Sequence, residues 1–276
     1  MSFTEAQLSR YSRHILLPEV GGKGQKKLAR ARVLIVGAGG LGSPAAFYLA
    51  ASGVGTLGMM DADCVDWSNL HRQVIHQTPD VGYAKVRSAQ EKIALLNPDV
   101  QVIPYFENFS EENAEKILRE FDIVLDGTDN FSAKFLINDA AYFSNKPLIH
   151  AGILRYHGQI LTILPGKTAC YRCIFPALPT GFVPSCQEAG VMGPLAGVIG
   201  TLQATEAMKL ILGVGTPLTN ALLQYDAFEG QFRKIRISRH AHCPLCGPSP
   251  SIVGLEAEEM PICEIASPLQ EGVSKR

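Results

Sequence analysis

Short apolar runs alternate with amphipathic stretches through the first half of the chain, and this rhythm predicts an α/β fold. Residues 31–36 are apolar and rich in β-branched side chains, a pattern typical of a buried parallel strand. A glycine-rich loop and an apolar helix over 43–51 follow at once. The alternation then predicts strands over 55–60, 100–105 and 121–125, and helices over 85–96 and 111–120. This order of elements indicates a doubly wound parallel sheet.

The rhythm changes in the second half of the chain. Residues 147–153 and 158–164 form a predicted hairpin, and residues 222–225 and 232–237 form a second antiparallel pair. A long apolar helix over 194–212 separates the two pairs. We therefore expect a Rossmann-like mixed sheet, in which a parallel nucleotide-binding half is followed by an antiparallel half.

Four segments follow from this reading of the chain. They are an N-terminal helical arm (1–30), a nucleotide-binding α/β part (31–165), a part with a crossover loop, helix, antiparallel strands and zinc site (166–247), and a tail (248–276). The second and third parts are expected to share one globular domain. The tail is rich in Pro, Ser and Glu, so we expect it to be mobile or to lie on the surface.

Charge and hydropathy exclude several classes of function. The net charge is −1 and the basic residues are scattered, so no nucleic-acid partner is expected. The most apolar long stretch, residues 191–212, contains Gln203, Glu206 and Lys209, so we interpret it as a buried helix and expect no membrane span. The first ten residues are polar and do not resemble a signal peptide, which favours a cytoplasmic location.

The glycine-rich loop is the first candidate for chemistry. Gly37, Gly39 and Gly42 form a G-x-G-x-x-G pattern between a predicted strand and a predicted helix. Small residues let the backbone approach phosphate, and the helix N-terminus offers N–H donors. Asp61 ends the next strand, where an acid can bind ribose hydroxyls. The pattern leaves NAD, FAD and ATP open, as well as a tight turn without a ligand.

Charged residues at the predicted strand ends favour a triphosphate. Arg72 and Lys85 are expected beyond the strand ends, near the glycine loop, and both side chains suit phosphate oxygens. Taken singly, each is also compatible with a solvated surface position. Asp129 follows the fourth strand, where a carboxylate can hold Mg²⁺ together with substrate phosphates or can cap the next helix.

Cysteine spacing predicts a metal site. Cys170, Cys173, Cys243 and Cys246 form two C-x-x-C pairs, which suit a closed, structural, tetrahedral Zn²⁺ site that joins two distant segments. Cys186 stands alone in a loop before a helix, and there it fits an activated nucleophile and an inert thiol equally well. The seven histidines form no recognisable metal-ligand or triad motif.

These motifs together resemble the adenylyltransferases of molybdopterin-synthase and thiamine biosynthesis, which are relatives of ubiquitin-activating enzymes. The resembling segments are RYSR (10–13), VLIVGAGGLG (33–42), SNLHRQ (68–73), Lys85, DGTDN (126–130), CYRC (170–173), EAGVMGPLAGVIGTLQATEAMK (188–209) and CPLC (243–246). They extend over nearly the whole chain. The resemblance implies an ATP- and Mg²⁺-dependent adenylyltransferase with a structural zinc ion, acting on the C-terminal Gly-Gly of a ubiquitin-like sulfur-carrier protein.

The resemblance also implies roles for individual residues. Asp61 would hold ribose, Asp129 would act through Mg²⁺, and Arg13 would reach into the site of the neighbouring subunit of a homodimer. The implied catalytic residues are Arg13, Arg72, Asp129 and, as the weakest case, Cys186. The implied nucleotide-binding residues are Gly37, Gly39, Gly40, Gly42, Asp61, Ser68, Asn69, Arg72, Lys85, Asp129 and Asn130.

Three alternative functions make distinguishable predictions. A nicotinamide-dependent oxidoreductase would share the glycine loop and Asp61. It would not account for Arg72, Lys85, Asp129 and the paired cysteines together. A non-catalytic module that docks a ubiquitin-like partner would lack one of the catalytic charges. An enzyme that activates a carboxylate on tRNA would need a basic stripe, which the scattered charges do not provide.

Overall fold

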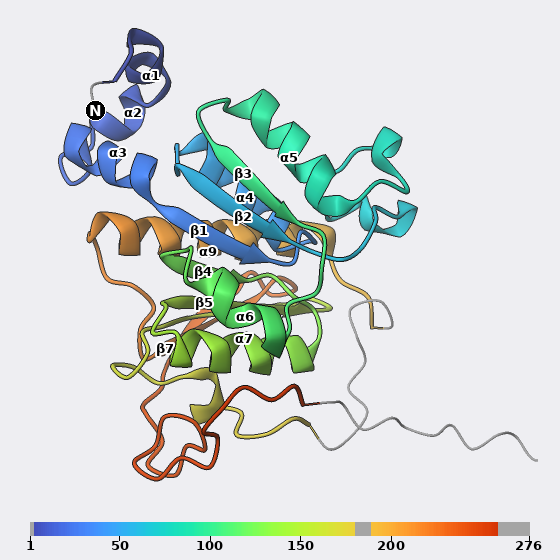
Figure 1. Ribbon diagram of the computed structural model, residues 1–276, viewed down its shortest axis with the longest axis vertical. Helices are drawn as coiled ribbons and strands as arrows, with labels where there is room; N and C mark the ends of the chain where they lie inside the picture. The colour runs from blue at the N-terminus through green and yellow to red at the C-terminus, as the bar shows by residue number, and fades with distance from the viewer. Residues whose placement is uncertain (1–2, 180–188, 259–276) are drawn as a thin grey trace, which may run out of the picture.

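The computed structural model describes residues 3–179 and 189–258, and its elements follow the predicted order (Figure 1). The strands are β1 (Arg32–Val36), β2 (Thr56–Met60), β3 (Gln101–Tyr105), β4 (Ile123–Asp126), β5 (Leu148–Leu154), β6 (His157–Ile163), β7 (Ala221–Asp226) and β8 (Gln231–Arg236). The α-helices are α1 (Glu5–Arg10), α2 (Ser12–Ile15), α3 (Gly21–Arg30), α4 (Gly42–Ala51), α5 (Lys85–Leu96), α6 (Glu111–Leu118), α7 (Phe131–Phe143) and α9 (Gly193–Leu212). Short 3₁₀ turns are η1 (Trp67–Asn69), η2 (Thr78–Asp80) and η3 (Tyr171–Cys173).

The strands form a mixed sheet, as the sequence predicted, and their order in it is β3-β2-β1-β4-β5-β6-β7-β8. Strands β1 to β5 run parallel, and β6, β7 and β8 continue the sheet by antiparallel pairing. In the register of the sheet, Val36 pairs with Met60 on one side and with Asp126 on the other. The ends of β1, β2 and β4 are therefore level, so the three loops that follow them emerge side by side at one edge.

Two layers of helices cover the sheet (Figure 1). Helices α3, α4, α5 and α9 pack on one face, and α6 and α7 pack on the other, together with the cysteine-containing turn η3. Helix α9 is long and apolar enough to cross a membrane, but half of its apolar window is buried inside the protein. Buried Gln203 donates to the carbonyls of Asp126 and Ile149, as expected for a helix packed in a protein core.

The two ends of the described chain differ in how they lie against the rest of the fold. Helices α1 and α2 project beyond α3 as an arm (Figure 1). Residues 248–258 contain no helix or strand, but they are attached, because the Ile252 N–H donates to the Pro244 carbonyl at 2.9 Å and Glu258 pairs with buried Arg172 at 2.5 Å. Residues 259–276 of the expected tail lie outside the described residues.

Candidate functional site

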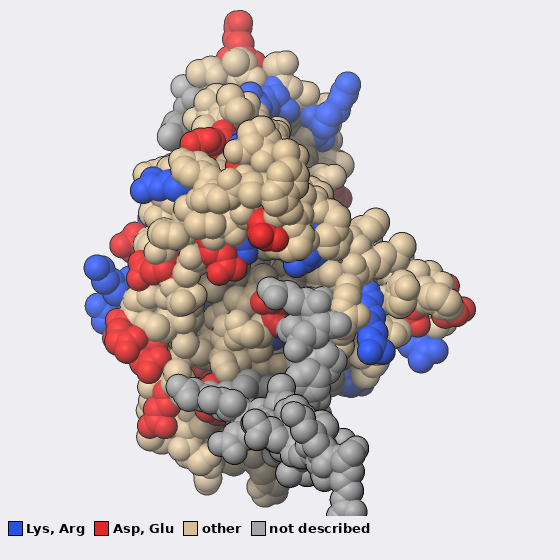
Figure 2. All heavy atoms as spheres, turned by 90° about the vertical axis from the view of Figure 1, so that its right-hand side faces the viewer, with Lys and Arg blue, Asp and Glu red and all other residues tan. Residues whose placement is uncertain are grey.

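A cavity of about 1270 Å³ opens at the edge where the parallel strands end. Figure 2 faces this edge and shows a hollow bordered by both acidic and basic side chains. Almost all the nucleotide-binding residues expected from the sequence line the cavity. They are Gly37, Gly39, Gly40, Asp61, Ser68, Asn69, Arg72, Lys85, Asp129 and Asn130.

The glycine loop is shaped by close backbone contacts that a side chain would prevent. Gly37 has a positive φ of 96°, and a Cβ at Gly42 would lie 1.9 Å from the Gly37 carbonyl oxygen. Gly42 therefore lies beneath the loop and supports it, whereas Gly39 and Gly40 border the cavity. The loop leads directly into α4, whose free N–H groups and positive potential favour an anion.

Asp61 is held by hydrogen bonds from backbone N–H groups, which the sequence did not predict. Its Oδ2 accepts the Ala38 N–H at 2.9 Å, and its Oδ1 accepts the Asp63 N–H at 2.9 Å. Burial raises the pKa of this carboxyl, although Lys85 and the two backbone donors act in the opposite direction. The Lys85 Nζ is 2.7 Å from Asp63 and 3.7 Å from Asp61, so it lies within the acidic loop at the start of α5.

The turn η1 positions the Arg72 side chain beside the glycine loop. The Arg72 Nη1 donates to the Ser68 carbonyl at 2.9 Å, and the Arg72 Cγ is the second-nearest atom, at 3.5 Å, to a Cβ built on Gly40. Ser68 and Asn69 are themselves fixed by Asp66, since the Ser68 Oγ donates to its carboxylate at 2.6 Å and the Asn69 Oδ1 accepts its N–H at 3.2 Å. The turn thus holds the guanidinium group of Arg72 beside the glycine loop.

Asp129 faces the cavity, and Asn130 caps α7. The Asn130 side chain accepts the Ala133 N–H at 2.7 Å, so the capping role considered for Asp129 belongs to its neighbour. Asp129 is exposed and has no hydrogen bond or ion pair with any other described residue. No residue of the described chain therefore competes with a cation or a ligand for its carboxylate.

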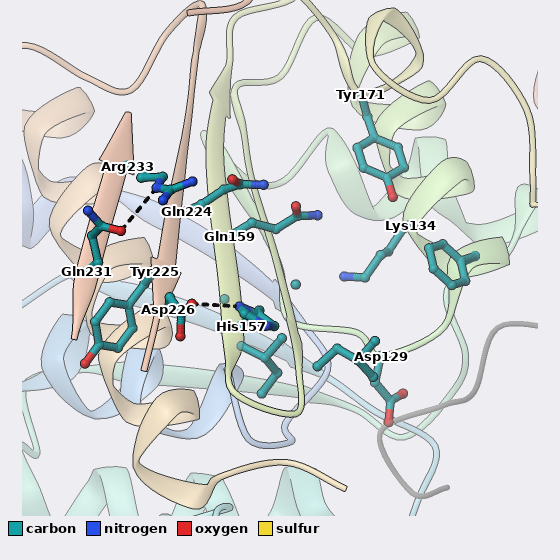
Figure 3. A pocket seen from close by; sticks show the side chains of 15 residues that line it. Asp129, Lys134, His157, Gln159, Tyr171, Gln224, Tyr225, Asp226, Gln231 and Arg233 are labelled. Carbon is teal, nitrogen blue, oxygen red and sulfur yellow. Dashed lines mark hydrogen bonds and ion pairs between the residues drawn. The ribbon is translucent and has the colours of Figure 1, made fainter. Parts of the chain in front are cut away.

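A second cavity of about 450 Å³ adjoins the first and shares Asp129 and Ile153 with it. Figure 3 shows the Lys134 ammonium, the Tyr171 hydroxyl and the amides of Gln159 and Gln224 pointing into this space between α7 and the antiparallel strands. Asp129 stands where the two cavities meet. The sequence motifs gave no indication of this second space.

A buried charge cluster adjoins the second cavity through Lys134, which lines it. Asp126 is fully buried, and its Oδ2 lies 3.2 Å from the Lys134 Nζ and 2.7 Å from the His150 Nδ1. Burial alone would raise the pKa of Asp126, but Lys134, His150 and the Thr128 hydroxyl outweigh it and hold that pKa far below its usual range. Tyr171 packs on His150 with ring centroids 4.2 Å apart.

The four paired cysteines come together, as predicted. Their sulfur atoms lie within 4.8 Å of one another, with Cys170 Sγ 3.8 Å from Cys173, 3.6 Å from Cys243 and 3.5 Å from Cys246. A tetrahedral Zn²⁺ with bonds of about 2.3 Å requires sulfur atoms about 3.8 Å apart, so the donor set fits zinc. Burial and the neighbouring thiolates raise the pKa of the Cys170 thiol, an effect that a divalent cation would reverse.

Two of the expected catalytic residues are not placed at the site. Arg13 is exposed on α2 and lines neither cavity of its own chain. Cys186 lies outside the described residues.

The glycine loop, the cations and the Asp129 carboxylate at the ends of parallel strands are typical of an α/β enzyme that acts on a nucleotide. The sequence matches the ThiF family over residues 11–245, and the chain belongs to this family. It is 48% identical over 257 residues to a sulfur carrier protein adenylyltransferase of Thermus thermophilus, covering 91% of this chain and 95% of that protein. It is 46% identical over 248 residues to a SAMP-activating enzyme E1 of Haloferax volcanii, covering 90% of this chain and 92% of that protein.

Longer relatives and solved structures agree with this assignment. The chain is 43% identical to the adenylyltransferase and sulfurtransferase MOCS3 of Sus scrofa over 94% of its own length and 57% of that protein. The crystal structure of E. coli MccB with MccA-N7isoASN superposes with a TM-score of 0.76 at 26% identity, over 87% of this chain and 74% of that one. MccB with ATP gives a TM-score of 0.72 at 27% identity, over 86% of this chain and 73% of that one.

Proposed function

We propose that this chain is an ATP-dependent adenylyltransferase that adenylates the C-terminal glycine of a ubiquitin-like sulfur-carrier protein of the thiamine or molybdopterin type and releases pyrophosphate. The observation that carries the proposal is the junction of two cavities at Asp129, one lined by the glycine loop and cations, the other of about 450 Å³ and lined by polar side chains such as Gln159 and Gln224. The names of the relatives from Thermus thermophilus and Haloferax volcanii support it.

The larger cavity would hold ATP. The glycine loop and the start of α4 would bind phosphate through backbone N–H groups, with Ser68, Asn69 and Asn130 lining the same space. Arg72 and Lys85 would neutralise phosphate charge, and Asp61 lies where ribose would be held. A Mg²⁺ ion would be held by Asp129 and the phosphates, and it would withdraw charge from the phosphorus under attack.

The smaller cavity would hold the end of the carrier. It is lined by donors and acceptors that suit an extended peptide, including Gln159, Gln224 and the Tyr171 hydroxyl (Figure 3). It leads to Asp129, where the two cavities meet. MccB, a structural neighbour, was solved both with MccA-N7isoASN and with ATP, which supports a two-ligand arrangement for this fold.

The chemical step follows from this arrangement. A terminal carboxylate oxygen of the carrier attacks the α-phosphorus, the bond from that phosphorus to the bridging oxygen breaks, and pyrophosphate leaves with the electron pair. The carboxylate is already ionised at neutral pH, so no general base is required. Two anions must approach each other, so the protein's main contribution is charge neutralisation and alignment by Arg72, Lys85 and Asp129 with its cation.

Several further features belong to the proposal. Arg13 would complete the site of a neighbouring subunit in a homodimer, since it lines neither cavity of its own chain. Cys170, Cys173, Cys243 and Cys246 would hold a structural zinc ion. Cys186 would contribute to the handling of the carrier after adenylation. We place the enzyme in the cytoplasm.

Exchange between ATP and labelled pyrophosphate tests the proposal. The purified protein with Mg²⁺ should catalyse exchange only when a carrier with a free C-terminal Gly-Gly is added, because only that carboxylate can form the reversible adenylate. A carrier that lacks its final glycine is the matched control. Exchange that does not depend on the carrier, or no exchange with any carrier by a protein that binds ATP, would reject the proposed reaction. Binding of NAD(P) but not ATP would favour an oxidoreductase.

A further inference from the structure

A buried histidine lies directly behind the glycine loop. His76 follows η1 and is 5% exposed, and its Nε2 lies 3.1 Å from the Ala38 carbonyl oxygen. Its Nδ1 lies 2.8 Å from the Oγ of Ser88, a fully buried residue of α5. Ala38 stands between Gly37 and Gly39, so the imidazole ring contacts the centre of the phosphate-binding loop.

The Ala38 contact determines which way the next N–H group points. A carbonyl oxygen can only accept, so Nε2 must carry a proton to bond to it. The peptide bond between Ala38 and Gly39 is trans, so the Gly39 N–H points away from the Ala38 carbonyl. Gly39 lines the nucleotide cavity, and its N–H has no hydrogen-bond partner among the residues that the structure describes. Fixing the carbonyl on the buried side therefore directs this donor toward the cavity.

We propose that His76 is a positioning residue for the adenylation reaction: it fixes the Ala38 carbonyl through Nε2 and so holds the Gly39 N–H ready for a phosphate oxygen of ATP. This inference rests on the proposed function. Asp61 holds the Ala38 N–H at 2.9 Å, so both peptide units that flank Ala38 are fixed from the protein side.

The surroundings of His76 favour a neutral ring with its proton on Nε2. Burial lowers the pKa of His76, Lys85 and Lys92 act in the same direction, and the Ala38 carbonyl and Asp80 oppose them. In the neutral ring Nδ1 is an acceptor and needs the Ser88 hydroxyl proton, for which Asp80 Oδ2 competes at 2.9 Å. Asp80 also receives the Gln77 N–H at 2.8 Å and Lys92 Nζ at 2.7 Å, so its carboxylate keeps two donors when the Ser88 hydroxyl donates to Nδ1.

Two substitutions separate the two ring nitrogens. In His76→Gln the side-chain amide can place an N–H donor near the position of Nε2, whereas in His76→Asn the shorter amide reaches only the position of Nδ1. Thr162→Val is the matched control, because it removes a different buried side-chain hydrogen bond, the 2.6 Å contact with Glu206, away from the nucleotide cavity.

Binding of ATP with Mg²⁺ is measured by titration calorimetry, and exchange kinetics are measured with the carrier. One positioned hydrogen bond predicts that His76→Asn weakens ATP binding and raises KM for ATP by roughly threefold to tenfold, with kcat kept within about twofold. His76→Gln should recover most of the affinity, and Thr162→Val should bind ATP as the unaltered protein does. Equal losses in the Asn and Gln variants, or no loss in either, would overturn the inference.

A measurement on the unaltered protein covers the case in which the variants do not fold. Long-range ¹H–¹⁵N spectra of the histidine side chains should show a single His76 proton on Nε2 at neutral pH. A proton on Nδ1 alone would overturn the inference. Failure of the unaltered protein to bind ATP would instead count against the proposed function, so the two can be rejected separately.

Discussion

Replacing Lys134 with methionine removes the cation from the buried cluster beside the second cavity and keeps most of the length of the side chain. Lys134 is 7% exposed, and its Nζ donates to the Ala151 carbonyl at 2.6 Å and lies 3.2 Å from the Asp126 Oδ2. Without it, Asp126 keeps the Thr128 hydroxyl and His150, but its negative charge is buried without a cation. Such a charge is strongly unfavourable in a protein interior.

Removing one partner of a buried ion pair costs about 3–5 kcal/mol of the free energy of unfolding. With an unfolding entropy of about 2.1 cal/mol/K per residue, a chain of 276 residues should lose about 5–9 °C in its unfolding midpoint. The double variant Asp126→Asn with Lys134→Met removes the unpaired charge, so it should recover most of this loss. Both variants can be compared with the unaltered protein by calorimetry at neutral pH.

The loss of stability in Lys134→Met should depend on pH, and the direction follows from the pKa of Asp126. The folded-state pKa of Asp126 is depressed, so its stabilising effect is present above the ordinary carboxyl range and is lost as the pH falls through the folded value. In Lys134→Met that pKa rises, so Asp126 takes up a proton sooner on acidification and the deficit relative to the unaltered protein should shrink as the pH falls from 7 toward 4.5. A deficit that is independent of pH, or a double variant no more stable than Lys134→Met, would refute this reasoning.

Three further predictions address the site and the cysteine cluster. Arg72→Ala and Asp129→Ala should each abolish ATP–pyrophosphate exchange. The unfolding midpoint should change little, because neither side chain is buried. Normal exchange in both variants would remove these residues from the mechanism. Gly42→Ala should weaken ATP binding and lower the unfolding midpoint, since its Cβ would lie 1.9 Å from the Gly37 carbonyl oxygen. Calorimetry that finds both quantities unchanged would show that the glycine loop can accommodate the added Cβ. Cys243→Ser should reduce bound zinc, measured by metal analysis, and lower the unfolding midpoint, whereas a fully metal-free unaltered protein of equal stability would contradict a structural zinc ion.

Local patterns were sufficient to predict most of the fold. Strand β1 and helix α5 lie within one residue of their predicted bounds, because apolar periodicity and the Asn97-Pro98 stop are local signals. The change from parallel to antiparallel pairing was also predicted from the spacing of the later strands. The glycine loop and the paired cysteines have fixed spacing, so they could be recognised in the same way.

The buried clusters could not be predicted, because their members meet only in the folded chain. Asp126, Lys134 and His150 come from β4, α7 and β5, and no spacing rule links them. His76 and Ala38 are likewise 38 residues apart, and the seven histidines formed no metal-ligand or triad motif. The capping of α7 by Asn130 in preference to Asp129 depends on backbone geometry that two adjacent capping residues leave open.

Mass spectrometry of the carrier after incubation with the enzyme, ATP and Mg²⁺, quenched in acid, tests the central claim most directly. The account predicts that the carrier gains the mass of one adenylyl group on its C-terminal glycine, and that this species is absent with Asp129→Ala or with a carrier lacking the final glycine. A carrier that stays unmodified while the enzyme binds ATP and exchanges no pyrophosphate would contradict the account.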